Sequence, residues 1–551
     1  MYFKNFFKVD IKGRKLRDNF LVALMFVLAC FIPDYVLRYA YGLPITIEML
    51  FFFGVVLFGI LLSLTNRTVF FFFILLIFIM QTIQLHFMAY FGSPIDPANI
   101  MNMFRETKDI FDVSYLKETW FVMPTLCACF GVLIWIFLKT KPIKLPLVWL
   151  ILLYLGSHKP YRAYTQTKGI WYFQPALTRP SLKNSISTFS YFTFQYWPKG
   201  YENVTIEYQP YELKESVSDV QNILVVWGES LYAGHLQMYG YGRETFPLMG
   251  KILQEEGWQK ALGMSSGIAT ATSTLLFFNT VREPANGQAL KTHVADMFAA
   301  AKAKGFHTYY LSNQESRLTM GMKTAVIDEL MTNDMNPIYF AKYKDEGLIE
   351  LLKEKGLKAR KNFIVLHMRS PHSPYENRYK GRESEFEKWT PAALSKNRLE
   401  YETNTYDNAL LYTDMVIFQM VKAFEKMAGP SNYSIFITAD HGQLFDYEGM
   451  WGHNNLTLEQ AHVPFFVKRA DKKALPKIIP HYEIGKMILR DIGFELKNPN
   501  EREGVYYLHG NNVDFPYDFI EYTIEDDKAI QIKRENTSNL LGNKVYIKSD
   551  Q

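Results

Sequence analysis

Cysteine is scarce in this chain of 551 residues. The three cysteines, Cys30, Cys127 and Cys129, all lie in apolar runs of the N-terminal third. Zinc fingers, iron–sulfur sites and disulfide frameworks need clusters of cysteine, so the sequence excludes them from the remaining part of the chain. The part of the chain after the apolar runs is long enough to bury a core that is stable without disulfides.

The chain also lacks a strong excess of charge of either sign. Its formal net charge is +5 at pH 7, and outside one basic run near the N-terminus the charges are mixed. Because nucleic-acid-binding proteins present concentrated basic surfaces, we expect no nucleic-acid partner.

Long hydrophobic runs, by contrast, fill the first 157 residues. A helix that crosses a bilayer needs about 20 largely apolar residues. Five segments approach this requirement, at about 20–40, 47–65, 69–91, 119–138 and 145–157, and the last is the shortest. We therefore expect a five-helix transmembrane anchor in residues 1–157. No small-residue cleavage site follows the first segment, so we expect no cleaved signal peptide.

Lysine and arginine near these segments predict the orientation. The stretch from Lys4 to Arg17 contains six basic residues, counting both ends. Lys139, Lys141 and Lys144 separate the fourth segment from the fifth. Basic loops stay in the cytoplasm, so an odd number of spans places everything after residue 157 on the outer side. Residues 158–218 are rich in Tyr, Trp, Phe and Pro. This composition fits a linker with short helices at the membrane interface, or aromatic side chains packed beneath the next domain, and both can hold.

Between residues 219 and 551, strand-like and helical patterns alternate. Strands are expected at residues 222–227, 308–311, 363–366, 433–438 and 463–467, and helices at 293–304, 348–355 and 404–427. This alternation is typical of an α/β domain in which helices cover both faces of a mostly parallel sheet.

Polar residues follow two of these strands directly. Glu229 comes after the first strand, and Asp440 and His441 come after the fourth. The carboxyl ends of parallel strands meet at one edge of a sheet, so these side chains should lie together. Two oxygen ligands and one nitrogen ligand suit zinc. Thr270 lies in a hydroxyl-rich turn before an apolar run, where a helix N-terminus can favour an anionic oxygen, and Thr272 is the second candidate in that turn.

A carboxylate, a hydroxyl, a carboxylate and an imidazole, in this chain order, resemble the alkaline phosphatase/sulfatase superfamily. The chain is more closely similar to the membrane-bound phosphoethanolamine transferases of that superfamily. Further similar segments are Tyr406–Asp414, His367–Pro374 and Trp451–Asn454. The resemblance implies that Glu229, Thr270, Asp440 and His441 bind one zinc ion tightly and that Thr270 is the nucleophile. A second, weaker zinc site is left open, and so is Mn²⁺ as the metal.

The resemblance also implies roles for residues outside the metal ligands. His372 and His453 match positions that act on the phosphoryl group, as hydrogen-bond donors or as the acid for the leaving oxygen. Asn313, Gln314 and Arg317 match a substrate-binding segment, and Asn102 and Glu106 lie in a loop that would approach the lipid headgroup. The roles of these seven residues are hypotheses. Gln443 stands where relatives usually have Glu.

The activity that the resemblance implies is transfer of phosphoethanolamine from phosphatidylethanolamine to lipopolysaccharide, through a phospho-threonine intermediate. The enzyme would be a monomer in the bacterial inner membrane with its catalytic domain in the periplasm. Because cysteine is absent from that domain, we favour the inner core over lipid A as the acceptor. A phosphoglycerol transferase of the lipoteichoic-acid-synthase type and a non-catalytic membrane sensor are the alternatives. No C/S-x-P-x-R sequence surrounds Thr270, which argues against a true sulfatase.

Overall fold

A computed structural model describes residues 16–535. The exceptions are positions 42, 44, 46, 92–93, 96–99, 101–120, 141–144, 166–172, 174, 177, 197–207, 320, 392–396, 449, 454, 470, 472 and 511–518. The chain forms two compact units, residues 1–203 and 204–551, each of which is described by itself.

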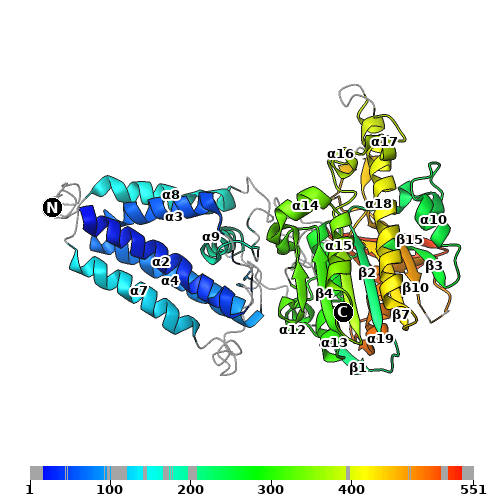
Figure 1. Cartoon of the computed structure of the whole chain (residues 1–551), viewed down its shortest axis with the longest axis horizontal. Coiled ribbons are helices and arrows are strands. Elements are labelled where there is room, and N and C mark those ends of the chain that lie inside the picture. The colour runs from blue at the N-terminus through cyan, green and yellow to red at the C-terminus, as the bar shows by residue number, and fades with distance from the viewer. Residues whose placement is uncertain are drawn as a thin grey trace. The chain divides into compact units, whose positions relative to one another are not determined.

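The first unit is helical (Figure 1). Its helices are α2 (Leu16–Ala40), α3 (Met49–Ser63), α4 (Arg67–Phe91), α7 (Val122–Lys139), α8 (Pro146–Tyr164) and α9 (Ser181–Tyr191), and a π-helical turn follows at Phe192–Tyr196. Among the residues that the structure describes, three helical segments are long and apolar enough to cross a membrane: Arg17–Ala40, Arg67–Ala89 and Val122–Lys139. These three correspond to the first, third and fourth of the five expected spans, and that they cross a membrane stays a prediction. The apolar helix α3 has 15 residues and α8 ends in a polar turn, so two further crossings stay a prediction.

The second unit is built around an eight-stranded sheet. From edge to edge, its strands are β11 (Ile478–Pro480), β3 (Trp258–Met264), β10 (His462–Lys468), β7 (Tyr433–Ala439), β2 (Asn222–Gly228), β6 (Asn362–His367), β4 (His307–Ser312) and β5 (Glu329–Met331). All five expected strands are present. The sheet is mixed, however, because β10 runs antiparallel to both β3 and β7. No helix longer than one 3-10 turn lies between β7 and β10 in the described residues, and strands joined without a helical crossover pair antiparallel.

Helices cover both faces of this sheet (Figure 1). One core contains Leu224 and Val226 of β2 and is closed by α10 (Pro247–Ile252), α14 (Pro337–Tyr343), α15 (Glu346–Lys355) and α18 (Arg398–Ala428). The other contains Ile223, Val225 and Trp227 and is closed by α11 (Thr270–Phe278), α12 (Gly287–Thr292), α13 (Met297–Ala303) and α19 (His481–Ile492). Alternate residues of β2 thus enter opposite cores, as the two-residue period of a strand requires.

Smaller elements complete the second unit. They are the short helices α16 (Glu376–Tyr379) and α17 (Glu383–Phe386), the pair β1 (Glu212–Glu215) and β12 (Phe494–Lys497), the hairpin β8 (Leu444–Tyr447) and β9 (Met450–Gly452), and the antiparallel sheet β13 (Val505–His509), β14 (Phe519–Glu525) and β15 (Lys528–Glu535). Because β1 pairs with β12, residues 212–215, which we expected in the linker, are part of the second unit.

Candidate active site

Two parallel neighbours, β2 and β7, bring the candidate ligands to one edge of the sheet. Their register places Gly228 beside Ala439, so the next residues of the two strands, Glu229 and Asp440, leave the sheet together. The amide of Asp440 donates to the carbonyl of Gly228 at 3.1 Å. The approach is close, since a Cβ on Gly228 would lie 3.3 Å from the Ala439 side chain.

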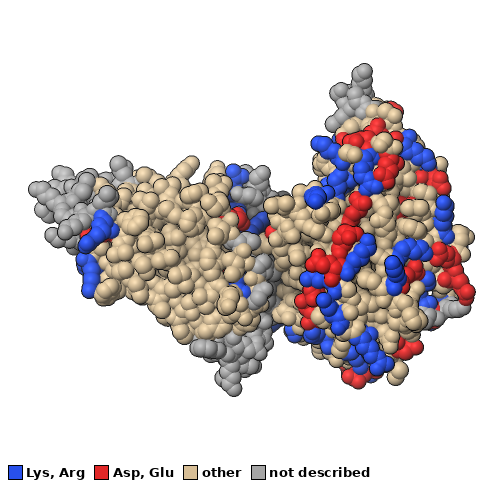
Figure 2. All heavy atoms as spheres, in the orientation of Figure 1, with Lys and Arg blue, Asp and Glu red and all other residues tan. Residues whose placement is uncertain are grey.

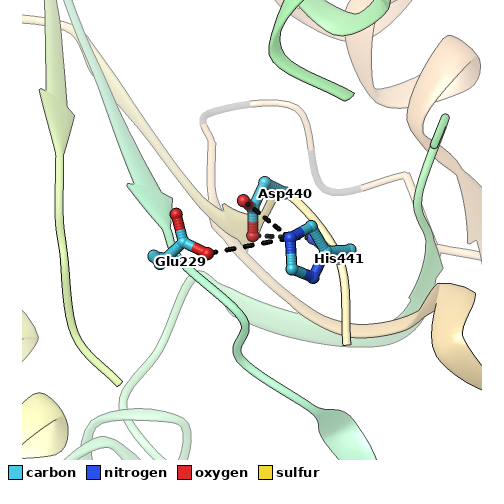
Figure 3. A group of neighbouring side chains, drawn as sticks. All are labelled: Glu229, Asp440 and His441. Carbon is cyan, nitrogen blue, oxygen red and sulfur yellow. Dashed lines mark hydrogen bonds and ion pairs between the residues drawn. The ribbon is translucent and has the colours of Figure 1, made fainter. Parts of the chain in front are cut away.

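Glu229, Asp440 and His441 form a compact group of potential metal ligands (Figure 3). Each offers one ligand atom, and these atoms lie within 4.8 Å of one another. His441 Nε2 lies 3.3 Å from Asp440 Oδ2 and 3.7 Å from Glu229 Oε1. All three side chains are buried, with no more than 1% of their surface exposed.

The surrounding hydrogen bonds aim these atoms inward. Asp440 Oδ1 accepts from the amides of Ser230 (2.8 Å) and His441 (2.7 Å), whereas Oδ2 is buried and makes no hydrogen bond. His441 Nδ1 lies 2.9 Å from the carbonyl of Gly442, to which it donates as Nδ1–H. This bond leaves the Nε2 lone pair facing the two carboxylates, which is the arrangement found for histidines that bind metals.

The electrostatics of the group suit a cation. Burial raises the pKa of Glu229, and the neighbouring Asp440 raises it further. Burial also raises the pKa of Asp440 to about 7 and lowers the pKa of His441. Two buried carboxylates side by side repel each other, and a divalent cation between them would offset both this repulsion and the cost of burial. The unpartnered Asp440 Oδ2 and the oxygen and nitrogen donors therefore fit a metal, and zinc accepts this donor set.

Thr270 is the first residue of α11 and faces this group. Its Oγ1 donates towards Glu229 Oε2 at 3.1 Å and Oε1 at 3.3 Å, and lies 3.4 Å from His441 Nε2. Thr272, by contrast, is buried and points back at Gly267, where an added Cβ would lie 2.6 Å from Thr272 Cγ2. The geometry therefore favours Thr270 over Thr272 as the reactive hydroxyl.

The turn before Thr270 is fixed on several sides. The amide of Gly267 donates to the Ser273 hydroxyl oxygen at 2.9 Å, and the amide of Ser266 donates to His481 Nδ1 at 3.1 Å. His509 of β13 donates its amide to the carbonyl of Ser266 at 2.9 Å, which ties the C-terminal sheet to the same turn. Sequence reasoning left His481 and His509 without a role, because no spacing signal links residues so distant in the chain to this turn.

His372 and His453 join His441 in a cluster of three imidazoles. The ring centroids of His441 and His453 are 4.8 Å apart, and those of His453 and His372 are 5.4 Å apart. His453 Nδ1 lies 3.3 Å from Gln443 Oε1, and the Gln443 amide also bonds the hydroxyl of the buried Tyr375. Gln443 and Tyr375 therefore orient His453.

The predicted substrate-binding residues lie in different surroundings. Gln314 is buried and donates to Glu229 Oε2 at 2.6 Å, so it contacts the ligand group directly. Asn313 is occupied by bonds of 2.7 Å to the side chains of Asp345 and Asn333. Arg317 pairs with the neighbouring Glu315 at 2.9 Å and stays 30% exposed. The structure brings only Gln314 of these three into contact with the site. Asn102 and Glu106 lie outside the described residues.

The segment Tyr406–Asp414 of α18 makes hydrogen bonds to the loop after β2 and to α10. The Tyr406 hydroxyl donates to the carbonyl of Ser230 at 2.7 Å and accepts from the amide of Tyr232 at 2.8 Å. Asp414 accepts from the first two free amides of α10, at 2.7 and 2.9 Å. The contacts of this segment hold the loop after β2 and the start of α10 in place.

The chain is similar in sequence and in structure to several known proteins. Residues 221–483 match the family model described as Sulfatase. Phosphoethanolamine transferase EptC of Escherichia coli (strain K12) is 25% identical over 274 residues, which cover 47% of this chain and 46% of that protein. The match thus spans about half the length of that relative. Phosphatidylethanolamine transferase Mcr-1 of Escherichia coli is 24% identical over 460 residues, which cover 75% of this chain and 82% of that protein. The crystal structure of the C-terminal periplasmic domain of EptC from Escherichia coli superposes with a TM-score of 0.45 at 20% identity, covering 59% of this chain and 96% of that domain.

Proposed function

We propose that this chain, in which residues 221–483 form a domain of the sulfatase family, transfers phosphoethanolamine from phosphatidylethanolamine to lipopolysaccharide. The observation that carries the proposal is the position of Thr270 Oγ1, 3.1 Å from Glu229 and 3.4 Å from His441. A hydroxyl at a helix N-terminus beside a buried ligand group is suited to attack phosphorus. The headgroup is inferred from relatives named phosphoethanolamine and phosphatidylethanolamine transferases.

The metal of this reaction is a zinc ion that Glu229, Asp440 and His441 would hold together with Thr270. When bound, zinc lowers the pKa of a hydroxyl and stabilises charge on phosphoryl oxygens. A single tightly bound ion would be coordinated by all three of these side chains. A second, weaker ion near His372 and His453, and Mn²⁺ in place of Zn²⁺, are the variants of this proposal that elemental analysis distinguishes.

The reaction is a double displacement, in which different side chains serve as nucleophile, proton acceptor and proton donor. Thr270 Oγ1 attacks phosphorus, the bond from phosphorus to the diacylglycerol oxygen breaks, and a phosphoethanolamine ester of Thr270 forms. The hydroxyl proton of Thr270 has an acceptor in Glu229 Oε2 at 3.1 Å. His453 and His372 lie beside His441 and supply donors for the phosphoryl oxygens and a proton for the leaving oxygen.

In the second half of the reaction, an acceptor oxygen attacks the same phosphorus and Thr270 leaves as the alcohol. The imidazole that protonated diacylglycerol can now remove the proton of an acceptor hydroxyl. Gln443 orients His453 for both steps through its amide oxygen.

The helical unit serves to keep both lipids close to the catalytic residues. Three helices have the length and apolarity of membrane spans, which supports a multi-pass inner-membrane protein with a periplasmic catalytic domain. Anchoring converts a search in three dimensions into one within the membrane and raises the effective substrate concentration. Asn102 and Glu106 remain proposed contacts of the lipid headgroup, and we propose a monomer.

The experiment that tests the function uses the full-length chain in vesicles that contain one donor lipid at a time. With lipopolysaccharide as acceptor, we expect diacylglycerol release and acceptor modification with phosphatidylethanolamine. Release with phosphatidylglycerol alone would identify a phosphoglycerol transferase. Absence of turnover with either lipid, in protein that contains zinc, would support a non-catalytic sensor.

A further inference from the structure

The turn before Thr270 is bonded at three points to His509, the last residue of β13. The carbonyl of Ser266 accepts from the amide of His509 at 2.9 Å and from its Nδ1 at 2.8 Å. The amide of Ile268 donates to the carbonyl of His509 at 3.1 Å. Gly267, between these bonds, is paired with His509 as in a parallel sheet. The C-terminal sheet therefore fixes the backbone just before the nucleophile.

The protonation of the His509 ring follows from its surroundings. The side chain is buried, and burial lowers its pKa to about 4, so the ring is neutral near pH 7 and has one proton. A carbonyl oxygen can only accept, so this proton lies on Nδ1 and is donated to Ser266. Nε2 is buried and makes no hydrogen bond to the described residues. The side chain thus supplies one donor to the turn, which the amide nitrogen of an asparagine could replace.

The same strand is bonded to the other end of the helix that Thr270 begins. Arg282 lies four residues after α11, and its Nη2 donates to the carbonyls of Arg502 and Val505, the second of which is the first residue of β13. Figure 2 shows Lys, Arg, Asp and Glu mixed over the visible surface of this unit, whereas the Arg282 side chain is only 2% exposed. A buried arginine therefore fastens the start of β13 to the segment after α11.

Strand β13 and helix α11 have matching lengths. The helix has nine residues and spans about 13.5 Å at 1.5 Å per residue. The four steps from Val505 to His509 span about 13 Å in an extended strand. Because its first residue is bonded beyond one end of α11 and its last residue at the other, β13 fixes both ends of this helix.

A small apolar core joins the same parts. It contains Ile268 of the turn, Leu508 of β13 and Ile520 of β14, all no more than 3% exposed. The Gln460 amide donates to the carbonyl of Ile268 at 2.7 Å, and its own carbonyl accepts from the amide of Gly442 at 2.7 Å. The turn is thus bonded both to the C-terminal sheet and to the loop that contains the metal ligands.

We propose that His509 is a positioning residue for Thr270, and that the C-terminal sheet β13–β15 is thereby part of the catalytic apparatus. The inference rests on the proposed function and extends it beyond residues 221–483, where the match to the sulfatase family ends. A reacting group must stay within about 0.5 Å of its productive position. This domain has no cysteine, so hydrogen bonds and packing supply that precision. Without the His509 donor, the carbonyl of Ser266 keeps one of its two bonds to this residue.

The test follows the first turnover of the full-length chain, loaded with zinc, in vesicles of phosphatidylethanolamine without acceptor. Diacylglycerol release gives a rate constant and the lipid fraction at half-maximal rate. His509→Leu removes the donor and should lower the rate constant about 10- to 100-fold, since a displacement of about 1 Å can cost about 100-fold. The half-maximal lipid fraction should not change, because the described hydrogen bonds of His372 and His453 do not involve His509.

Two further variants separate the hydrogen bond from general structure. His509→Asn places an amide donor where Nδ1 lies and should keep the rate constant within about threefold of the unaltered protein. His307→Leu is the matched control, because it makes the same substitution at the amino end of β4, the opposite edge of the sheet, and should change neither quantity. Zinc content should be equal in all variants, since His509 contacts none of the three ligands in the described residues.

If His509→Leu fails to fold, Ile520→Val replaces it. This change removes one carbon from the core that contains Ile268, leaves every hydrogen bond in place, and should lower the rate constant at least about threefold. Ile349→Val, the same change in the core on the other face of the main sheet, should leave the rate constant unaltered.

Three results would overturn the inference. They are an unchanged rate constant in His509→Leu or in its replacement Ile520→Val, equal losses in His509→Leu and His509→Asn, and an effect confined to the half-maximal lipid fraction, which would assign His509 to lipid binding. If the unaltered protein releases no diacylglycerol, the proposed function fails. If it does and the variants show one of these three results, only the inference about His509 fails.

Discussion

Gly442 follows the ligand pair Asp440–His441 and has no room for a side chain. A Cβ at this position would lie 2.9 Å from the carbonyl oxygen of Gln460, 3.0 Å from that of His462 and 3.0 Å from a ring carbon of Tyr232. Two of these atoms belong to the backbone, so they cannot rotate away. In addition, the Gly442 amide donates to the Gln460 carbonyl at 2.7 Å, which fixes the distance between the two segments.

Gly442→Ala should therefore displace the residues that precede it. Normal contact requires a shift of about 0.5 Å, and overpacking of this kind costs about 1–3 kcal/mol in the free energy of unfolding. A metal site tolerates displacements of its ligands up to about 0.5 Å, so His441 Nε2 should leave its productive position. We expect the affinity for zinc to fall about 10- to 100-fold, as when a supporting contact of a ligand is lost.

The assay is competition for zinc against a chromophoric chelator, together with urea denaturation of the same samples. Gly287→Ala is the matched control, because nothing lies within 4 Å of its added Cβ, at the start of α12. The control should keep zinc affinity and stability. Unaltered zinc affinity in Gly442→Ala would refute the argument that crowding at this position sets the position of His441.

Three further predictions follow from individual contacts. Gln314→Met removes the donor to Glu229 Oε2 and should weaken zinc binding about 10-fold in a chelator titration, whereas an unchanged titration would contradict a supporting role. Tyr406→Phe leaves one buried and one partly buried backbone group of the loop after β2 without a partner and should lower the free energy of urea unfolding by about 1–3 kcal/mol; a loss below about 0.5 kcal/mol would mean that water replaces the hydroxyl. Burial lowers the pKa of His367 from 6.5 to about 3, so its neutral form stabilises the fold above pH 6.5 and this contribution is lost as the pH falls towards 3. His367→Asn should therefore lose less stability than the unaltered protein over that range, and equal losses would contradict the assignment.

The sequence was sufficient to predict the α/β domain and the central group of ligands. Strands that are buried on both faces are short, apolar and β-branched, and Asn222–Gly228 and Tyr433–Ala439 both have this character. Residues directly after such strands reach the same edge when the strands are parallel. Local patterns thus place Glu229, Asp440 and His441 together without any long-range information.

Contacts between distant segments could not be predicted in this way. The reversal of β10 depends on a connection that makes no long helix, and its apolar pattern is the same for either direction. Asn313 and Gln314 are adjacent and chemically alike, yet one amide is occupied by Asp345 and the other reaches Glu229. Tertiary packing decides which of two neighbouring side chains faces a site, so a single sequence does not predict it.

The central claim is that Thr270 becomes the covalent carrier of phosphoethanolamine. The most direct test is mass spectrometry of peptides from the full-length protein after incubation with phosphatidylethanolamine and no acceptor. We expect the mass of one phosphoethanolamine group on the peptide that contains Thr270, fragment ions that assign it to this residue, and its loss in Thr270→Ala. An adduct that persists in Thr270→Ala, or that maps to Thr272, would contradict the account.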